Sequence, residues 1–261
     1  MAPAYSFIPT ESSYPASAGT VPAMLGTPGA DTLAGTPASD VVFGRDGNDV
    51  LRGHGGNDTL CGNEGDDVID GGADLDIAIY AGPRSSYGIL VQAHGVSVLD
   101  RAGQEGVDYL VNVERLAFDD RSVALDLGAN AGRAAMLLGA IFGLEALYNR
   151  ESMGRALSVY DAGRMDAEIM ERAIQMRWNY ATPTNEQFVN TVYQNVYGHA
   201  PSSAEFEHYM ARLETGRDTL SSLGMLAQYS DANVAHIDLV GLAQTGVEYS
   251  PFVVQIQLVT E

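Results

Sequence analysis

The 261-residue sequence predicts an α+β multidomain chain in which stacked short β-strands precede an all-α domain. Three observations predict this fold class. Residues 26–80 repeat every nine residues, and residues 81–127 contain short β-prone runs with bulky side chains. From about Ala131 onwards, apolar residues recur with a period near 3.6, which is typical of helices.

The repeat begins at Gly26 and contains six units. Every unit has glycine at position one, aspartate at position six and an apolar residue at position eight. The aspartates are Asp31, Asp40, Asp49, Asp58, Asp67 and Asp76. Because side chains alternate across a strand, the three residues after each aspartate predict a short strand with one inward side chain. Such a strand can only contribute to stacked turns that share a narrow apolar seam.

Stacking would place the aspartates in columns of like charge. Carboxylates, together with carbonyl oxygens exposed by glycine, are the ligands that Ca²⁺ prefers, with roughly six to eight oxygens at ~2.3–2.6 Å. The repeat therefore predicts several bound calcium ions. A disordered acidic linker has a similar composition, but it does not require glycine, aspartate and an apolar residue to stay in phase.

The run GRDGNDVLRGHGGNDTLCGNEGDDVI closely resembles the calcium-binding nonapeptide repeat of RTX proteins. The resemblance implies a parallel β-roll with two units per turn, and ions held between each unit and the unit two later. One ion would then lie among Arg45, Gly47, Asp49, Gly62, Glu64 and Asp67. The next would lie among His54, Gly56, Asp58, Gly71, Ala73 and Asp76. A third would use Thr36, Ala38, Asp40, Gly53, Gly55 and Asp58, and a fourth Thr27, Gly29, Asp31, Gly44, Asp46 and Asp49.

The first two units depart from this pattern. They have Pro28 and Pro37 at position three, and Ala38 replaces the glycine of position four. The last unit has Asp74 where glycine is expected.

Composition limits the choice of partners and the means of stabilisation. The net charge of −20, from 34 acidic and 14 basic residues, argues against nucleic acid as a partner. The single cysteine, Cys61, permits no intramolecular disulfide, so we expect bound metal to stabilise the fold instead. No apolar stretch reaches the ~18 residues of a transmembrane span.

The two ends of the sequence bear on export. Residues 1–25 are rich in Ser, Pro, Ala and Thr, which predicts a flexible segment, and they lack the features of a Sec signal peptide. The RTX resemblance implies type I secretion guided by an uncleaved C-terminal signal, and the tail at residues 244–261 is compatible with one. We therefore expect an extracellular or cell-surface protein.

Residues 81–127 are expected to form a β cap that buries the end of the roll. Asp119 and Asp120 within it have two interpretations, a further calcium site or solvated surface carboxylates. Residues 128–243 predict the helical domain, with a capping box formed by Thr184 and Gln187, and a helix that starts at Ser202.

The segments FVNTVYQNVYGHAPSSAEFEHYMARLETG and LVGLAQTGVEYSP resemble DUF4214, a helical domain of unknown function. This resemblance implies an architecture and no activity. The uncharged stretch Ala134–Leu144 contains Gly139 and Gly143 in a close-packing spacing, and it fits either a buried core helix or a membrane-active helix.

No catalytic motif appears in the sequence. The five histidines lack the HExxH spacing of zinc proteases, and neither a GxSxG elbow nor a phosphate-binding loop is present. We therefore expect a protein that is not an enzyme, although an unrecognised hydrolase site in the helical half stays open.

The expected function is that of a secreted protein that folds on calcium and has a structural, adhesive or partner-binding role. It would act at the cell surface or matrix, as a surface-layer protein does, through a protein or envelope partner or through self-association. The alternative is a membrane-active toxin or bacteriocin-like effector.

Overall fold

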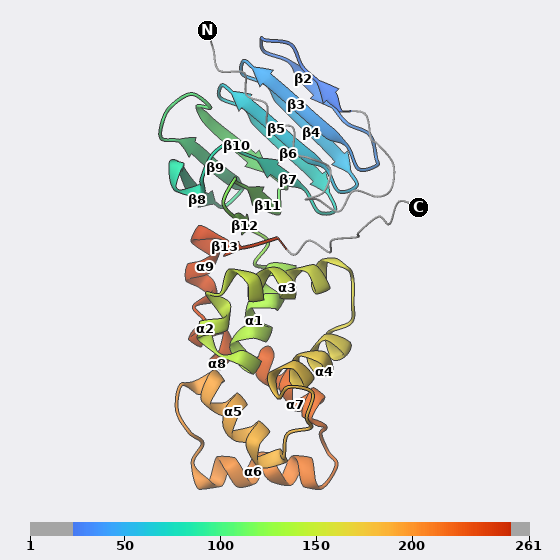
Figure 1. Cartoon of the computed structure of the whole chain (residues 1–261), viewed down its shortest axis with the longest axis vertical. Helices are drawn as coiled ribbons and strands as arrows, with labels where there is room; N and C mark the ends of the chain where they lie inside the picture. The colour runs from blue at the N-terminus through green and yellow to red at the C-terminus, as the bar shows by residue number, and fades with distance from the viewer. Residues whose placement is uncertain (1–22, 252–261) are drawn as a thin grey trace, which may run out of the picture. The chain divides into compact units, whose positions relative to one another are not determined.

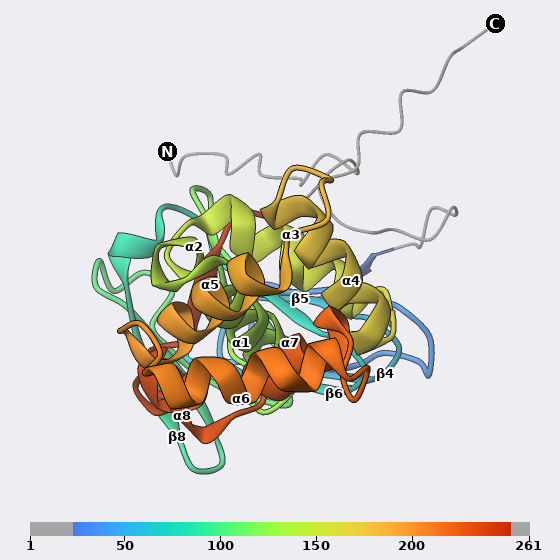
Figure 2. The same ribbon diagram turned by 90° about the horizontal axis from the view of Figure 1, so that it is seen from below.

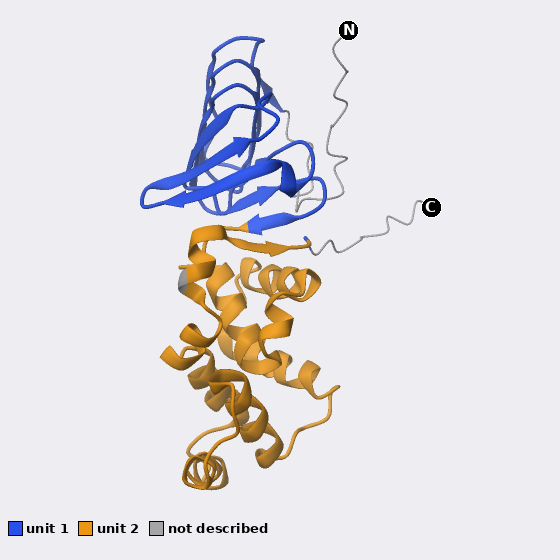
Figure 3. Ribbon diagram, turned by 90° about the vertical axis from the view of Figure 1, so that its left-hand side faces the viewer, with its two compact units in different colours: residues 1–123, 251–261 blue, residues 124–250 orange. Residues whose placement is uncertain are grey.

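The structure is a computed structural model that describes residues 23–251 and divides into two compact units, one ending at Val123 and the other spanning Ala124–Ser250 (Figure 3). The first unit is a parallel β-solenoid of about 3 turns, and the second is helical. The predicted fold class is therefore confirmed.

The strands of the repeats lie side by side in two parallel sheets (Figure 1). One sheet contains β1 (Met24–Leu25), β3 (Val41–Asp46), β5 (Thr59–Glu64) and β7 (Ile77–Ile79). The other contains β2 (Thr32–Ala34), β4 (Val50–Gly55) and β6 (Val68–Ala73). Val42 pairs with Leu60, and Leu51 pairs with Ile69. Each strand thus pairs with the strand two units later, so two nonapeptides make one turn.

The apolar residue at position eight forms the seam between the two sheets. Val42, Leu51, Leu60 and Ala78 are 0% exposed, and Ile69 is 1% exposed. Leu33, in the first unit, is only half-buried. The predicted inward position is confirmed, and the seam is closed from the second unit onwards.

The strands that follow the repeats extend both sheets. A 3-10 turn (η1, Arg84–Ser86) precedes them, and they are β8 (Tyr87–Gln92), β9 (Gly95–Asp100), β10 (Val107–Val111), β11 (Arg115–Ala117) and β12 (Ser122–Ala124). β9 is antiparallel to both β8 and β10, whereas β10 pairs with β6 and β11 pairs with β7 in parallel. Tyr80, Tyr87 and Phe118 pack together with ring centroids 5.1–5.6 Å apart, which supplies the aromatic core that the narrow roll lacks.

The helical unit is built around α1 (Asn130–Phe142), which contacts α3, α5 and α7 (Figure 2). The other helices are α2 (Leu144–Leu147), α3 (Arg150–Asp161), α4 (Asp166–Arg177), α5 (Asn185–Tyr197), α6 (Ser203–Glu214), α7 (Leu220–Gln228), α8 (Asp231–His236) and α9 (Leu239–Thr245). The short strand β13 (Val247–Tyr249) follows them.

The predicted start signals of α5 and α6 are confirmed. The Thr184 hydroxyl accepts a hydrogen bond from the Gln187 N–H, and the Gln187 side chain accepts one from the Thr184 N–H. Ser202 forms the same capping box with Glu205 ahead of α6. Each box satisfies backbone donors that the first turn of a helix leaves without partners.

The stretch Ala134–Leu144 is a buried core helix and not an exposed one. Most of α1 is buried in the apolar core of the helical unit. A Cβ built on Gly139 would overlap Ile237 Cγ2 and lie 3.1 Å from Asn233 Oδ1, so this glycine permits close packing against α8. Gly143 has a different task, because it ends α1 with φ of 88°.

Parts of the sequence-based interpretation lie outside the described residues. They are most of the N-terminal segment (residues 1–22) and most of the C-terminal tail (residues 252–261). Among residues 23–251, no helix has the length and apolarity needed to cross a bilayer.

Candidate metal centre

The aspartates of the repeats form two hydrogen-bonded ladders, one along each side of the roll. In each ladder the backbone N–H of one aspartate donates to Oδ1 of the aspartate 18 residues later. The donor to acceptor distances are 2.7 Å for Asp31 to Asp49 and Asp49 to Asp67, and 2.8 Å for Asp40 to Asp58 and Asp58 to Asp76. Oδ1 of the later aspartate in each pair therefore binds the backbone of the preceding turn.

The second carboxylate oxygen has no such partner in four of the six units. Oδ2 of Asp49, Asp58, Asp67 and Asp76 is buried and accepts no hydrogen bond from the part of the chain that the structure describes. Each of these aspartates is at most 1% exposed. A buried carboxylate oxygen without a partner is costly, so these four oxygens mark positions where a cation would stabilise the fold.

Carbonyl oxygens lie beside the unsatisfied oxygens of Asp49 and Asp58. A Cβ built on Gly44 would overlap Asp49 Oδ2 and lie 2.9 Å from the carbonyl oxygen of Gly62 in the stacked unit. A Cβ built on Gly53 would overlap Asp58 Oδ2 and the carbonyl oxygen of Gly71. The invariable glycine of position one thus leaves room where a carboxylate and a carbonyl oxygen of the next turn converge.

The loops of the last four units share a backbone conformation that the first two lack. Positions two and four have positive φ in each of these loops, as in Arg45 (80°), Gly47 (118°), His54 (79°) and Gly56 (91°). In the first two units a proline at position three disfavours this conformation in the residue before it. Only the last four loops therefore repeat one geometry.

The structure stacks the predicted ligands in register. Asp46 pairs with Glu64 and Gly55 pairs with Ala73, so the loop of one unit lies against the loop two units later. This brings residues 45–49 together with residues 62–67, and residues 54–58 together with residues 71–76. These are the first two of the four sets predicted from the sequence.

The sets that include the first two units also differ in the hydrogen bonds to their aspartates. Asp31 Oδ2 accepts hydrogen bonds from the backbone N–H and the hydroxyl of Thr27, at 2.6 and 2.8 Å. Asp40 Oδ2 accepts the same two bonds from Thr36, at 2.5 and 2.8 Å. An ion at either position would compete with donors of the protein for this oxygen.

Burial changes the acidity of the unsatisfied carboxylates. It raises the pKa of Asp67 to about 6 and that of Asp76 to about 7, and it also raises the pKa values of Asp49 and Asp58. Removal from water disfavours the ionised form, and neighbouring aspartates add repulsion. A divalent cation would reverse both effects.

The residues present fit Ca²⁺. Among residues 23–251, no three His, Cys, Asp or Glu side chains converge as a metal-binding group, so carbonyl oxygens would supply the remaining ligands. Two carboxylates with several backbone carbonyls form an all-oxygen set of the kind that Ca²⁺ binds in proteins.

Two acidic residues outside the repeats continue the ladders, and neither was among the ligands predicted from the sequence. Asp108 Oδ1 accepts the backbone N–H of Asp67 at 3.0 Å, and Glu114 Oε2 accepts that of Asp76 at 2.9 Å. Asp108 and Glu114 each precede an apolar residue by two positions, as positions six and eight do in the repeats. That spacing in VDYLVNVERLA is the signal that could have identified them.

Asp119 and Asp120 have protein partners. Asp119 Oδ2 accepts the Gly82 N–H at 2.9 Å, and Asp120 Oδ1 accepts the Arg84 N–H at 2.8 Å. Asp120 also forms an ion pair with Arg121 at 2.9 Å. These contacts favour a structural role in the turn over the calcium interpretation.

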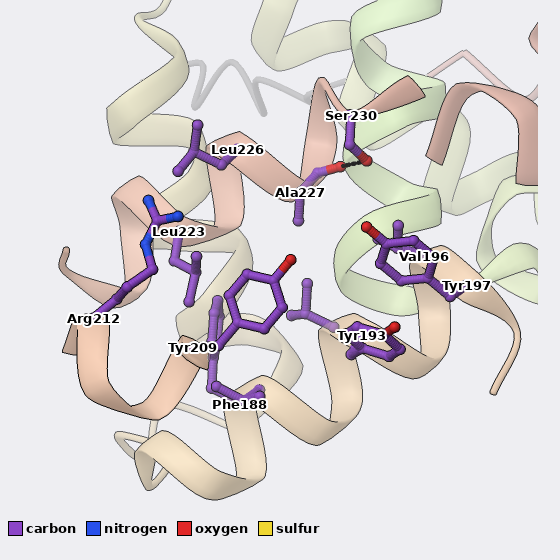
Figure 4. A pocket seen from close by; sticks show the side chains of 12 residues that line it. Phe188, Tyr193, Val196, Tyr197, Tyr209, Arg212, Leu223, Leu226, Ala227 and Ser230 are labelled. Atoms are coloured by element: carbon purple, nitrogen blue, oxygen red, sulfur yellow. Dashed lines mark hydrogen bonds between the residues drawn. The ribbon is translucent and has the colours of Figure 1, made fainter. Parts of the chain in front are cut away.

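The helical unit contains a cavity of about 180 Å³ between α5, α6 and α7 (Figure 4). Its walls are mostly apolar and aromatic, and include Phe188, Val192, Tyr193, Tyr209 and Leu223. Arg212 at its edge forms an ion pair with Asp218 at 2.6 Å.

Comparisons with known proteins agree with this geometry. The family model of the RTX calcium-binding nonapeptide repeat matches residues 25–60 and 55–78, and that of the domain of unknown function DUF4214 matches residues 175–228. No protein of curated function matches the chain.

Among solved structures, the chain is similar to the extracellular lipase LipA from Serratia marcescens, with 22% identity and a TM-score of 0.20. The match covers 36% of this chain and 13% of the lipase chain. RTX repeats bind calcium and indicate export by type I secretion. The unit of stacked strands therefore carries RTX calcium-binding repeats, and the helical unit contains a DUF4214 domain.

Proposed function

We propose that this protein folds on calcium outside the cell and then serves a structural, adhesive or partner-binding role at the cell surface or matrix, without enzymatic activity. The observation that carries the proposal is the set of four buried carboxylate oxygens without partners, at Asp49, Asp58, Asp67 and Asp76. They make the closed roll dependent on bound cations.

At low calcium, the two ladders hold like charges close together. The rungs of each ladder are joined through a short N–H to carboxylate bond, so their carboxylates cannot move apart while the roll is closed. Repulsion and burial then favour an open chain, which can pass through a secretion channel. Outside the cell, calcium binding adds its free energy to folding because the open chain has no preformed site.

The helical unit is the part that we assign to partner contact. The inner face of the roll forms its own seam, and the aspartates beside its strands form the ladders. The helical unit has its own apolar core, formed by α1 and its neighbours, and folds around residues that take no part in the ladders. The partner is a protein or envelope component of the producing cell, or a second copy of the chain.

Cell fractionation tests this role. The full chain is added to washed producing cells with 5–10 mM calcium, taken here as roughly saturating for sites of this class, and the cells are then washed with either calcium or EGTA. We expect retention in calcium and release by EGTA. A variant with Asp49→Asn and Asp58→Asn should show weaker retention. Recovery of the protein in the medium under all conditions would rule out the adhesive role.

The membrane-active alternative has less support. It depended on the uncharged stretch Ala134–Leu144, and α1 buries this stretch in the helical core. Liposomes loaded with a fluorescent dye provide the direct test, because a membrane-active effector would release the dye when calcium is present.

A further inference from the structure

The ladder that contains Asp58 and Asp76 continues past the last repeat. The Asp58 N–H donates to Asp76 Oδ1 at 2.8 Å, and the Asp58 carbonyl accepts from the Ile77 N–H at 2.9 Å. One turn later, the Asp76 N–H donates to Glu114 Oε2 at 2.9 Å, and the Asp76 carbonyl accepts from the Arg115 N–H at 3.1 Å. Because β11 pairs with β7 in register, Glu114 occupies the position that an aspartate of the next unit would have.

A carbonyl oxygen is also in place at this level. A Cβ built on Gly71 would contact Asp76 Oδ2 and the carbonyl oxygen of Asn112. One turn earlier, a Cβ built on Gly53 meets Asp58 Oδ2 and the carbonyl oxygen of Gly71 in the same way. Asn112 therefore presents its carbonyl oxygen where a repeat would present that of its first glycine.

The carboxylate aimed at this position is buried and unsatisfied. Asp76 is 0% exposed, and its Oδ2 accepts no hydrogen bond from the described residues. The loop of the sixth unit has the conformation of the other calcium loops, with φ of 108° at Gly72 and 80° at Asp74. The replacement of glycine by Asp74 thus leaves the loop geometry unchanged.

We propose that Asn112 and Glu114, outside the repeats, complete a further calcium site on the sixth unit. Its ligands are the carboxylates of Asp76 and Glu114 and the carbonyl oxygen of Asn112, with the carbonyl oxygens of Gly72 and Asp74 from the loop. Only Val113 separates Asn112 from Glu114, whereas four residues separate Gly71 from Asp76. The site lacks the carbonyl of position three, so it is more open and weaker than the sites between two repeats.

The other ladder differs at the corresponding position. Asp108 takes the rung above Asp67, but the three atoms nearest to a Cβ built on Gly62 all belong to Asp67, whereas those nearest to a Cβ built on Gly71 include the carbonyl oxygen of Asn112. The extra site therefore belongs to the Asp76 ladder.

This site rests on the proposed calcium binding by the repeats, and a calcium titration of the full chain separates the two. Isothermal titration with calcium alone compares the wild type with Glu114→Gln, which retains an oxygen to accept the Asp76 N–H. We expect Glu114→Gln to lose one ion, or to bind the weakest ion at least tenfold less tightly. Glu171→Gln, an exposed change on α4 with the same chemistry, should leave all ions unchanged.

The outcomes are distinct. If the wild type and Glu114→Gln bind the same number of ions with the same affinities, the repeats bind calcium and the extra site is refuted. If the wild type binds no calcium, the proposed function itself fails. Should Glu114→Gln not fold in saturating calcium, Glu114→Asp retains the carboxylate on a shorter side chain. The proposal then predicts that Glu114→Asp binds as many ions as the wild type but binds the weakest ion less tightly. An unchanged affinity for the weakest ion would overturn it.

Discussion

Removal of calcium is expected to unfold the roll while the helical unit stays folded. Each filled site contributes about 2.7 kcal/mol when free calcium is a hundredfold above its dissociation constant. The unsatisfied oxygens of Asp49, Asp58 and Asp76, each beside a carbonyl oxygen, correspond to three sites and therefore to about 8 kcal/mol. A whole domain is typically stable by only ~5–15 kcal/mol, so the loss of this contribution should leave the roll unfolded.

Hydrogen exchange measured by mass spectrometry is the appropriate assay, because it reports on each segment separately. In EGTA, peptides from residues 41–79 should lose their protection, whereas peptides from α5 and α7 should retain it as an internal control. Magnesium in place of calcium should not restore protection, since Mg²⁺ is smaller and loses its water ligands reluctantly. Equal protection of residues 41–79 with and without calcium would refute the reasoning.

Three further changes test the physical basis of the fold. In a denaturant titration in calcium, Leu60→Ala, in the fully buried seam, should lower the free energy of unfolding by ~2–5 kcal/mol. Val68→Ala, at a side chain that is 42% exposed, should lower it by about 0.5 kcal/mol or less. Without calcium, the stability of the roll should fall between about pH 4 and pH 7, because over this range the folded chain retains a proton on Asp76, with its pKa near 7, that the unfolded chain has lost. In calcium, the affinity for calcium measured by titration should rise over the same range as protons cease to compete. Gly139→Ala should destabilise the helical unit by ~1–3 kcal/mol in thermal melts, since the added methyl group overlaps Ile237, and an unchanged melting temperature would contradict this packing.

The repeat is the part of the fold that sequence predicts best, because each of its positions has one physical task. Glycine at position one leaves space for oxygen atoms, aspartate at position six makes the ladder, and the apolar residue at position eight fills the seam. These tasks recur every nine residues, and the 18-residue register follows once the resemblance to RTX repeats supplies two units per turn. The helix starts at Thr184 and Ser202 are equally local, and the sequence predicts them for that reason.

The ends of the ladders could not be predicted in the same way. Asp67 and Asp108 are 41 residues apart, and Asp76 and Glu114 are 38 residues apart, so neither pair fits the period of the repeat. The strands β8 and β9 intervene, and only the pairing of β10 and β11 with the roll brings the acids into place. At the N-terminal end of the roll, the prolines are visible in the sequence. The hydrogen bond from the Thr27 N–H to Asp31 Oδ2, however, depends on the conformation that Pro28 helps to set.

The two oxygens of each aspartate have different tasks, which explains why the repeat requires aspartate at position six and not asparagine. Oδ1 accepts the N–H of the turn below, a task that an amide oxygen performs equally well. Oδ2 points to the carbonyl oxygens beside the glycine, where the NH₂ group of asparagine would exclude a cation. At the first turn, Thr27 and Thr36 donate hydrogen bonds to the second oxygen of Asp31 and Asp40. At the last turn, calcium bound with Asn112 and Glu114 would satisfy the second oxygen of Asp76.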